Sequence, residues 1–374
     1  MTRAAGVVGF WTALSRVTGF IRDMAIALFL GAGPGADAFF VACRIPNLLR
    51  RLFAEGALTA AFIPTYVEIL QKKGISEAAK LAQVAFTFSA MLLTVVTLLG
   101  VTLTPYIVEI IAPGFGSDPE KFALTVELTR IMFPYIFFIS LVALLSGALN
   151  SLGMFAPSAA APLLLNMTMI GSLLFFSGHY RHPAYYPLSW AVIMAGFLQL
   201  LLQMLFMPGM GIRLRLNFNF SNPALRKMGV LFVPAALGGA VYQINVLIGT
   251  ILASMLPVGG VSWLYYADRL VELPLGIFAI ALGTAVLPSM SRLAGQGDYR
   301  ALMKSLAFSL SLIAFLTIPA SVGLIILREP IIAILFQRGL FTYLDTQETA
   351  YALLFYTSGL WAYSGLKVVT QAFF

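Results

Sequence analysis

The stretch MLLTVVTLLGVTLTPYIVEIIA, residues 91–112, is apolar almost throughout and carries a single charged side chain, Glu109. A helix of about 20 apolar residues crosses the hydrocarbon core of a bilayer, and this stretch is long enough to do so. Polar and apolar residues do not alternate in it, as they would in a membrane β-strand. The stretch therefore predicts a transmembrane α-helix.

Runs of this kind recur along the sequence of 374 residues, of which 60% are apolar and 10% are charged. A soluble domain carries about 25% charged residues, so this chain lacks the polar surface of a soluble protein. Breaks with turn-forming residues, such as GAGPG (31–35) and PVGG (257–260), separate the runs. We therefore predict an all-α polytopic membrane protein whose spans are residues 5–30, 36–70, 77–111, 120–149, 157–177, 185–208, 226–254, 260–291, 301–327 and 346–372.

Basic residues concentrate in the loops on one side of these spans. Cytoplasmic loops carry an excess of lysine and arginine, so we predict a cytoplasmic N-terminus. The net charge of +8 is partly this excess, and because no soluble basic domain is visible, we do not expect nucleic-acid binding. The basic residues on the predicted cytoplasmic side are Lys72, Lys73, Lys80, Arg213, Arg215, Arg226, Lys227, Arg292, Arg300 and Lys304.

A weak internal repeat places ALTAAFIP (57–64) over ALGTAVLP (281–288), and Lys80 over Lys304. Transporters are often built from two such repeats with the substrate between them. We predict two pseudo-symmetric lobes around a central cavity, residues 1–210 with spans one to six and residues 211–374 with spans seven to ten. The second lobe has no counterpart of spans five and six, so we expect it to be truncated. A natural ten-span protein is the alternative.

Ionisable residues within spans are costly and mark functional sites by default. Arginine presents a planar fork that suits bidentate contact with phosphate, so several arginines in a low-dielectric cleft suit a diphosphate. Acids accompany them, and each arginine is therefore either a ligand or half of a structural or gating ion pair. No Ser-His-Asp set or acidic metal cluster is visible, so we expect neither an enzyme nor a metal site. The intramembrane charges are Arg16, Arg22, Asp23, Asp37, Arg44, Arg50, Arg51, Glu55, Asp268, Arg269, Glu272 and Lys367.

Two long motifs resemble one known family. SRVTGFIRDMAIALFLGAGPGADAFFVACRIPNLLRRLFAEGALTAAFIP (15–64) resembles the N-terminal signature of the MurJ/MviN family, the lipid II flippases of the MOP exporter superfamily. VSWLYYADRLVELPLGIFAIALGTAVLPSMS (261–291) resembles the family's eighth helix, and APGF (112–115) and FQRGLFT (336–342) fit as well. The resemblance extends over essentially the whole chain.

The resemblance implies a MOP/MATE-like fold of fourteen helices, which again points to a truncated second lobe. It implies translocation of lipid II, a peptidoglycan precursor on undecaprenyl diphosphate, from the cytoplasmic to the periplasmic leaflet by alternating access. The expected location is the bacterial inner membrane, and the expected process is cell-wall biogenesis, which maintains cell shape. By motif position, the substrate-binding residues are Arg16, Arg22, Asp23 and Arg269. The gating or supporting residues are Asp37, Asn47, Arg50, Glu55, Ser262, Glu272 and Lys367.

The energy source of transport and the protein partners are predicted from less specific features of the sequence. The seventh span carries no acidic residue, which counts against sodium coupling, and the choice between sodium and the membrane potential stays open. We expect no cofactor, a monomer, and contact with the cell-wall synthesis machinery. Two alternatives remain: an exporter of another lipid-linked oligosaccharide, and a membrane enzyme acting on polyprenyl substrates.

Overall fold

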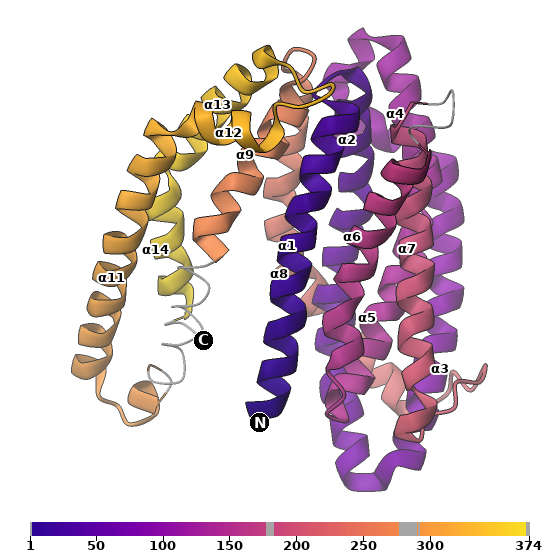
Figure 1. Ribbon diagram of the computed structural model, residues 1–374. Helices are drawn as coiled ribbons and strands as arrows, with labels where there is room; N and C mark the ends of the chain where they lie inside the picture. The colour runs from indigo at the N-terminus through magenta and orange to yellow at the C-terminus, as the bar shows by residue number, and fades with distance from the viewer. Residues whose placement is uncertain (1, 177–182, 277–289, 291, 372–374) are drawn as a thin grey trace. The chain divides into compact units, whose positions relative to one another are not determined.

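The computed structural model describes residues 2–176, 183–276, 290 and 292–371, and within these ranges the side chains of all but residues 2–5, 52–55 and 371. The described chain forms helices joined by short connections, as the sequence predicts (Figure 1). It divides into two compact units, Met1–Val258 and Gly259–Phe374, and each is described here by itself. The predicted lobe boundary at residues 210 and 211 rests on the repeat rather than on contacts, and it stays a prediction.

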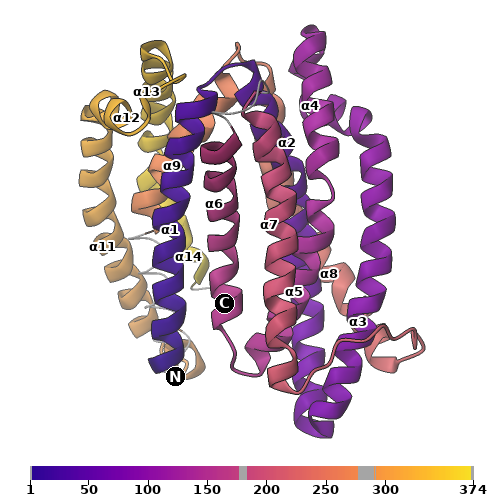
Figure 2. The ribbon, with the colours of Figure 1, turned by 45° about the vertical axis from the view of Figure 1, so that its right-hand side comes forward.

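Unit 1 is a bundle in which α1 packs against α6, α6 against α7, and α5 against both α3 and α7 (Figure 2). In the same unit α2 packs against α4, and α8 packs against α3 and η1. The elements of unit 1 are α1 (Thr2–Leu30), α2 (Pro34–Leu49), the π-helix η1 (Arg50–Leu58), α3 (Thr59–Ile111), the 3₁₀ helix η2 (Pro113–Ser117), α4 (Pro119–Met132), α5 (Tyr135–Ser151), α6 (Ala156–Phe176), α7 (Tyr185–Phe206), the 3₁₀ helix η3 (Pro208–Met210) and α8 (Pro223–Ser254).

Glycine and proline residues lie where these helices turn, break or begin. The backbone of α3 turns at Gly74, whose φ of 79° lies in the left-handed region that favours glycine, and this turn separates the second and third predicted spans. The fourth predicted span, 120–149, is broken between α4 and α5 at Pro134, because proline has no N–H to donate to the preceding helical turn. Pro119 and Pro223 occupy the first turns of α4 and α8, where their missing N–H groups leave no helical bond unmade.

Six helices of the described residues are long and apolar enough to cross a membrane, by length and composition alone. One of them, Gly56–Ile111, contains the turn at Gly74 and so covers parts of two predicted spans. Of the remaining predicted spans, 5–30 falls in α1, 36–70 begins in α2 and η1, 346–372 covers most of α13 and α14, and 260–291 begins with α9 and extends outside the described residues. By itself each of α2, α9 and α13 is shorter than the about 20 residues that cross a bilayer.

The buried and exposed faces of unit 1 are both apolar. Ile45, Val108, Val126, Phe133 and Ile136 form a buried cluster that joins α2, α3, α4 and α5. Large apolar side chains also cover the exposed face of α8, of whose span only 6% is buried. Lipid tails are as apolar as leucine, so outward-facing apolar side chains are what a membrane helix requires.

Unit 2 contains α9 (Gly260–Pro274), α11 (Tyr299–Ile326), α12 (Arg328–Phe336), α13 (Tyr343–Ser358) and α14 (Leu360–Gln371). The indole N–H of Trp263 on α9 donates to Asp345 on α13 at 3.0 Å, and Asp345 also completes a capping box with Thr342. The ring of Tyr266 packs against Phe341 with ring centroids 5.2 Å apart. The second copy of the predicted repeat, residues 281–288, lies outside the described residues.

Candidate functional site

Arg22 lies in a polar cluster between α1 and α6. Its Nε and Nη2 donate to Asp23 Oδ1 at 2.9 and 2.7 Å, and its Nη1 donates to Asn166 Oδ1 at 2.9 Å. The side chain of Arg22 is 15% exposed and that of Asp23 is 3% exposed. The structure therefore joins two of the predicted substrate-binding residues in one ion pair and fixes the plane of the guanidinium.

Asn166 is a residue of this cluster that the sequence analysis missed. Its Nδ2 donates to the backbone oxygen of Ser15 at 2.9 Å and to Thr18 Oγ1 at 3.1 Å. Both ends of the buried amide are thus bonded to α1 or to Arg22, which determines which way the amide points. The available signal was a lone amide in the middle of the apolar span AAAPLLLNMTMIGSLLFF, 159–176.

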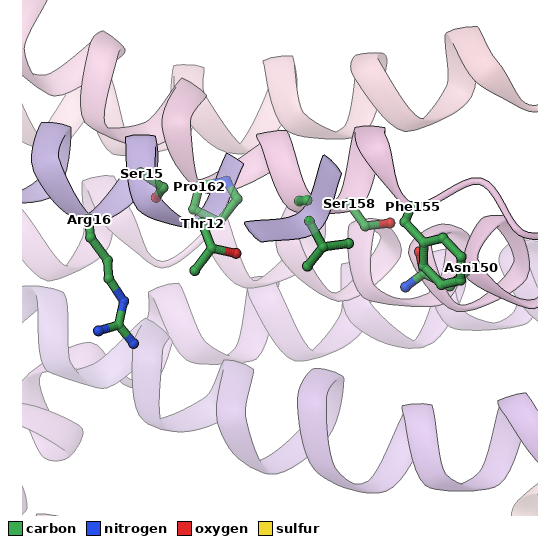
Figure 3. A pocket seen from close by; sticks show the side chains of 9 residues that line it. Thr12, Ser15, Arg16, Asn150, Phe155, Ser158 and Pro162 are labelled. Carbon is green, nitrogen blue, oxygen red and sulfur yellow. The ribbon is translucent and has the colours of Figure 1, made fainter. Parts of the chain in front are cut away.

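Arg16 is exposed on the same helix, one to two turns before Arg22. It lines a cavity of about 410 Å³ between the first half of α1 and the segment that joins α5 to α6. Figure 3 shows the lining residues as a row along the helices, with Arg16 at one end and Asn150 and Phe155 at the other. The structure thus places Arg16 at a cavity edge and Arg22 in a closed hydrogen-bonded cluster.

The π-helix η1 begins at Arg50, and π-helical turns often mark functional sites. Arg50 Nε donates to Asn47 Oδ1 at 3.3 Å, and both residues line a second cavity of about 480 Å³. Arg51 is exposed, so of the two adjacent arginines it is Arg50 that contributes to this cavity. The side chain of Glu55 lies outside the described residues, and its predicted gating role stays a prediction.

Asp37 forms a fully buried ion pair with Lys121. Lys121 Nζ lies 2.7 Å from Asp37 Oδ2, and the two side chains are 5% and 0% exposed. The same ammonium lies 4.0 Å from the ring centroid of Phe115. Lys121 lies in the first turn of α4, whose N-cap is Asp118, near the start of the predicted span 120–149. Asp37 therefore links α2 to α4.

Arg44 is also bonded within unit 1. Its Nη1 donates to Thr250 Oγ1 on α8 at 2.9 Å. The hydroxyl of Thr250 in turn donates to the backbone oxygen of Val246, so Thr250 Oγ1 can accept the bond from Arg44. Arg44 therefore connects α2 to α8, which fits the structural alternative for an intramembrane arginine.

In unit 2 the predicted residues lie on α9 and α14. Arg269 Nη1 lies 2.6 Å from Glu272 Oε2, one turn along α9, and the guanidinium carbon is 4.8 Å from the ring centroid of Tyr265. Ser262 is buried on the same helix. Lys367 on α14 lies over the ring of Tyr363 at 5.3 Å. The predicted approach of Arg269 to Arg16 and Arg22 across a central cavity stays a prediction.

Each of the candidate arginines Arg22 and Arg269 thus has a carboxylate beside it. Guanidinium groups bond to carboxylates and to phosphates in the same bidentate geometry, so an anionic ligand competes with the carboxylate for such an arginine. Among the described residues, no group of three His, Cys, Asp or Glu side chains could hold a metal ion. The chemistry available at these residues is recognition of an anion.

Comparison with known proteins identifies the family of the chain. The sequence model of a family described as Lipid II flippase MurJ matches residues 26–374. The chain is 38% identical to the probable lipid II flippase MurJ of Vibrio cholerae serotype O1, over 98% of this chain and 71% of that protein. It is also 38% identical to the lipid II flippase MurJ of Burkholderia cenocepacia, over 100% of this chain and 73% of that protein.

The solved structures show the fold. A lipid II flippase MurJ in an inward closed conformation matches with a TM-score of 0.81 and 28% identity, over 98% of this chain and 75% of that one. A multidrug resistance MATE family transporter of the MOP superfamily, inward-facing, matches with a TM-score of 0.72 and 11% identity, over 96% of this chain and 82% of that one. The second likeness concerns the fold alone. The chain is a multi-span helical membrane protein with the MurJ/MATE fold, and it belongs to the lipid II flippase MurJ family.

Proposed function

We propose that this protein moves lipid II from the cytoplasmic to the periplasmic leaflet of the bacterial inner membrane. The observation that carries the proposal is membership of a flippase family over nearly the whole chain. Family membership also sets aside the alternative of a membrane enzyme. A further alternative is an exporter of cationic drugs, and the arginines within the spans of this chain argue against it.

In this proposal Arg16, Arg22 and Arg269 bind the diphosphate of lipid II, with Asp23 positioning Arg22. The planar guanidinium group of an arginine contacts two phosphate oxygens at once, whereas the ammonium group of a lysine does not. The bonds from Asp23 and Asn166 support this role, because they orient the Arg22 guanidinium before a ligand binds. Glu272 positions Arg269 in the same way in unit 2. The residues proposed to gate or support the site are Asp37, Asn47, Arg50, Glu55, Ser262, Glu272 and Lys367.

Transport proceeds by alternating access of two lobes, with the N-terminus in the cytoplasm and the lipid tail in the bilayer throughout. No covalent chemistry is needed. The membrane potential supplies about 2.3 kcal/mol per elementary charge per 100 mV, which is enough to bias the conformational cycle. The protein works as a monomer, and its partner proteins come from the cell-wall synthesis machinery.

Genetic complementation tests the proposal. The full-length gene is expressed in bacteria depleted of their own lipid II flippase, with Arg22→Ala and Arg269→Ala as site variants. Arg215→Ala is the matched control, because Arg215 is exposed in the connection between η3 and α8. We expect growth to be restored by the wild type and the control and not by the site variants, with equal amounts of protein in the membrane. Failure of the wild type would contradict the substrate, and full rescue by both site variants would contradict the site.

A further inference from the structure

The connection between η3 and α8 contains nine residues, IRLRLNFNF (212–220), in which apolar and polar side chains alternate without a break. We call residues 212–220 the strip. A period of two is typical of a β-strand with one apolar face. In the described structure, however, residues 212–219 belong to neither a helix nor a strand, and Figure 2 shows the connection as an irregular trace that runs across α3. The apolar face of the strip therefore requires a partner other than a neighbouring strand of the described chain.

Two hydrogen bonds hold the strip on α3 in unit 1. Gln83 Nε2 donates to the backbone oxygen of Arg213 at 2.7 Å, and the backbone N–H of Asn217 donates to Thr87 Oγ1 at 2.9 Å. At about 1.5 Å per residue, Gln83 and Thr87 lie about 9 and 15 Å from the start of the predicted span 77–111. That span is about 52 Å long and a bilayer with its headgroups is about 40–45 Å thick, so the strip crosses α3 at the depth of the headgroups.

The apolar face of the strip is open at its second half. Leu216, Phe218 and Phe220 are 68%, 61% and 39% exposed. The ring centroid of Phe220 lies 5.8 Å from that of Phe88 on α3 and 6.1 Å from that of Phe218. From Phe88 onward, exposed apolar side chains follow one face of α3 at helical spacing: Phe88, Met91, Leu92, Val95, Leu98 and Leu99. The apolar face of the strip thus continues the exposed apolar surface of a predicted membrane span.

The polar face of the strip is basic. Arg213 and Arg215 are exposed, and in the described part of the chain neither guanidinium has a hydrogen bond or an ion pair. Residues 211–226 include no acidic side chain. Because successive side chains of an extended chain point to opposite sides, the arginines lie opposite the apolar face. A bilayer surface has the same two layers, acyl chains beneath anionic phosphates, so its chemistry is complementary to both faces of the strip.

We propose that the strip is an interfacial anchor that binds anionic phospholipid in the cytoplasmic leaflet. Leu216, Phe218 and Phe220 lie among the upper parts of the acyl chains, and Arg213 and Arg215 contact lipid phosphates. The bound lipid is a component of the bilayer and not the cargo, so the inference does not depend on the proposed transport. Loss of one arginine leaves the other and the apolar side chains in place, so Arg215→Ala remains the control for transport.

A fluorophore on the strip tests the inference in lipid nanodiscs that contain the purified chain. Bimane is attached to Phe218→Cys in a Cys43→Ser background, which removes the only native cysteine of the sequence. The discs contain equal amounts of phosphatidylglycerol and phosphatidylcholine, and bromine, which quenches bimane on contact, is placed on the acyl chains of one lipid or of the other. Asn219→Cys is the matched control position, because Asn219 is the exposed neighbour on the polar face.

We expect brominated lipid to quench bimane at residue 218 and to leave bimane at residue 219 almost unchanged. At residue 218 we expect phosphatidylglycerol to be preferred over phosphatidylcholine about fivefold or more, since one basic residue near an anionic surface contributes about that factor. The double variant Arg213→Gln/Arg215→Gln abolishes this preference and keeps the quenching. Arg292→Gln/Arg300→Gln retains the preference, because it removes two exposed charges of unit 2 on the same predicted side of the membrane.

Three results would overturn the inference. If neither brominated lipid quenches bimane at residue 218, the apolar face lies in water or against a protein partner. Equal quenching by the two lipids with both arginines present would contradict the choice of an anionic lipid. Equal quenching at residues 218 and 219 would contradict the two-faced arrangement of the strip. None of these results depends on whether the chain transports lipid II.

Discussion

At the scale of single residues, the hydrogen bonds of Arg22 determine how its guanidinium is oriented in the proposed site. All three of its guanidinium nitrogens are bonded to Asp23 or Asn166, and Asn166 is itself bonded to the backbone of α1. A flexible arginine loses rotamer entropy when it binds a ligand, and a fixed one loses less, so affinity rises. The cluster therefore acts by orienting the guanidinium in advance.

Asn166 is the residue on which this orientation depends. Replacing it by alanine removes the acceptor of Arg22 Nη1 and leaves two α1 groups with one bond fewer. We predict that Asn166→Ala slows lipid II transport about tenfold, since a hydrogen bond to a charged group contributes about 1.5–3 kcal/mol. Thr168→Ala is the control, because the hydroxyl of Thr168 bonds only to the backbone of its own helix in the described structure. Transport by Asn166→Ala at the wild-type rate would show that the amide does not position Arg22.

Variants of the Asp37–Lys121 pair test whether this ion pair gates transport or only links α2 to α4. Replacing Asp37 leaves the buried ammonium of Lys121 without its carboxylate, and loss of one partner of a buried ion pair destabilises a protein by about 3–5 kcal/mol. We predict that Asp37→Leu and Lys121→Leu each lower the melting temperature in detergent, whereas the double variant recovers most of it. Because Asp37 is among the residues proposed to gate or support the site, we also expect the stable double variant to transport lipid II more slowly than the wild type. A double variant that is stable and transports at the wild-type rate would show that the pair only links α2 to α4.

At the scale of helices, the sequence predicts those features that depend on residues close together in the chain. Helical spans, their breaks at glycine and proline, and the prolines at the starts of α4 and α8 follow from the chain itself. The π-helical turn at Arg50–Leu58 does not follow, because an extra residue in a helical turn is stabilised by its neighbours. Asn166 and Lys121 were missed for the same reason: their roles come from partners that lie far away in the sequence.

The contact between η2 and α8 gives an element-scale prediction. A Cβ added to Gly114 would lie 2.2 Å from the backbone oxygen of Ser254, whereas one added to Gly116 would meet nothing within 4 Å. Gly114 N also donates to Ser254 Oγ at 3.2 Å. We predict that Gly114→Ala destabilises the protein by about 1–3 kcal/mol through overpacking, and that Gly116→Ala does not. Thermal unfolding of the two variants compares them directly, and equal melting temperatures would contradict this account of the contact.

At the scale of the whole molecule, the account requires motion between the two lobes. Spin labels test this in a Cys43→Ser background, which removes the only native cysteine of the sequence. One pair is Gln71, exposed on α3 just before its turn at Gly74, with Gln296, exposed before α11, and we predict both to be cytoplasmic. The other pair is Gly116, exposed on η2, with Leu340, exposed between α12 and α13, and we predict both to be periplasmic. We expect lipid II to shift the two distance distributions in opposite directions. A shift of both in the same direction, or of neither, would exclude alternating access.

The central claim, that this chain flips lipid II with Arg22 at its binding site, is tested most directly in reconstituted vesicles. Purified protein is placed in liposomes that contain lipid II with a fluorescent head group, and a membrane-impermeant reductant bleaches the outer leaflet. The account predicts that wild-type vesicles lose inner-leaflet fluorescence as well, and that Arg22→Ala slows this loss about 10- to 100-fold, as expected for one charge-assisted contact. Bleaching that stops at the outer leaflet with wild-type protein, or an unchanged rate with Arg22→Ala, would contradict it.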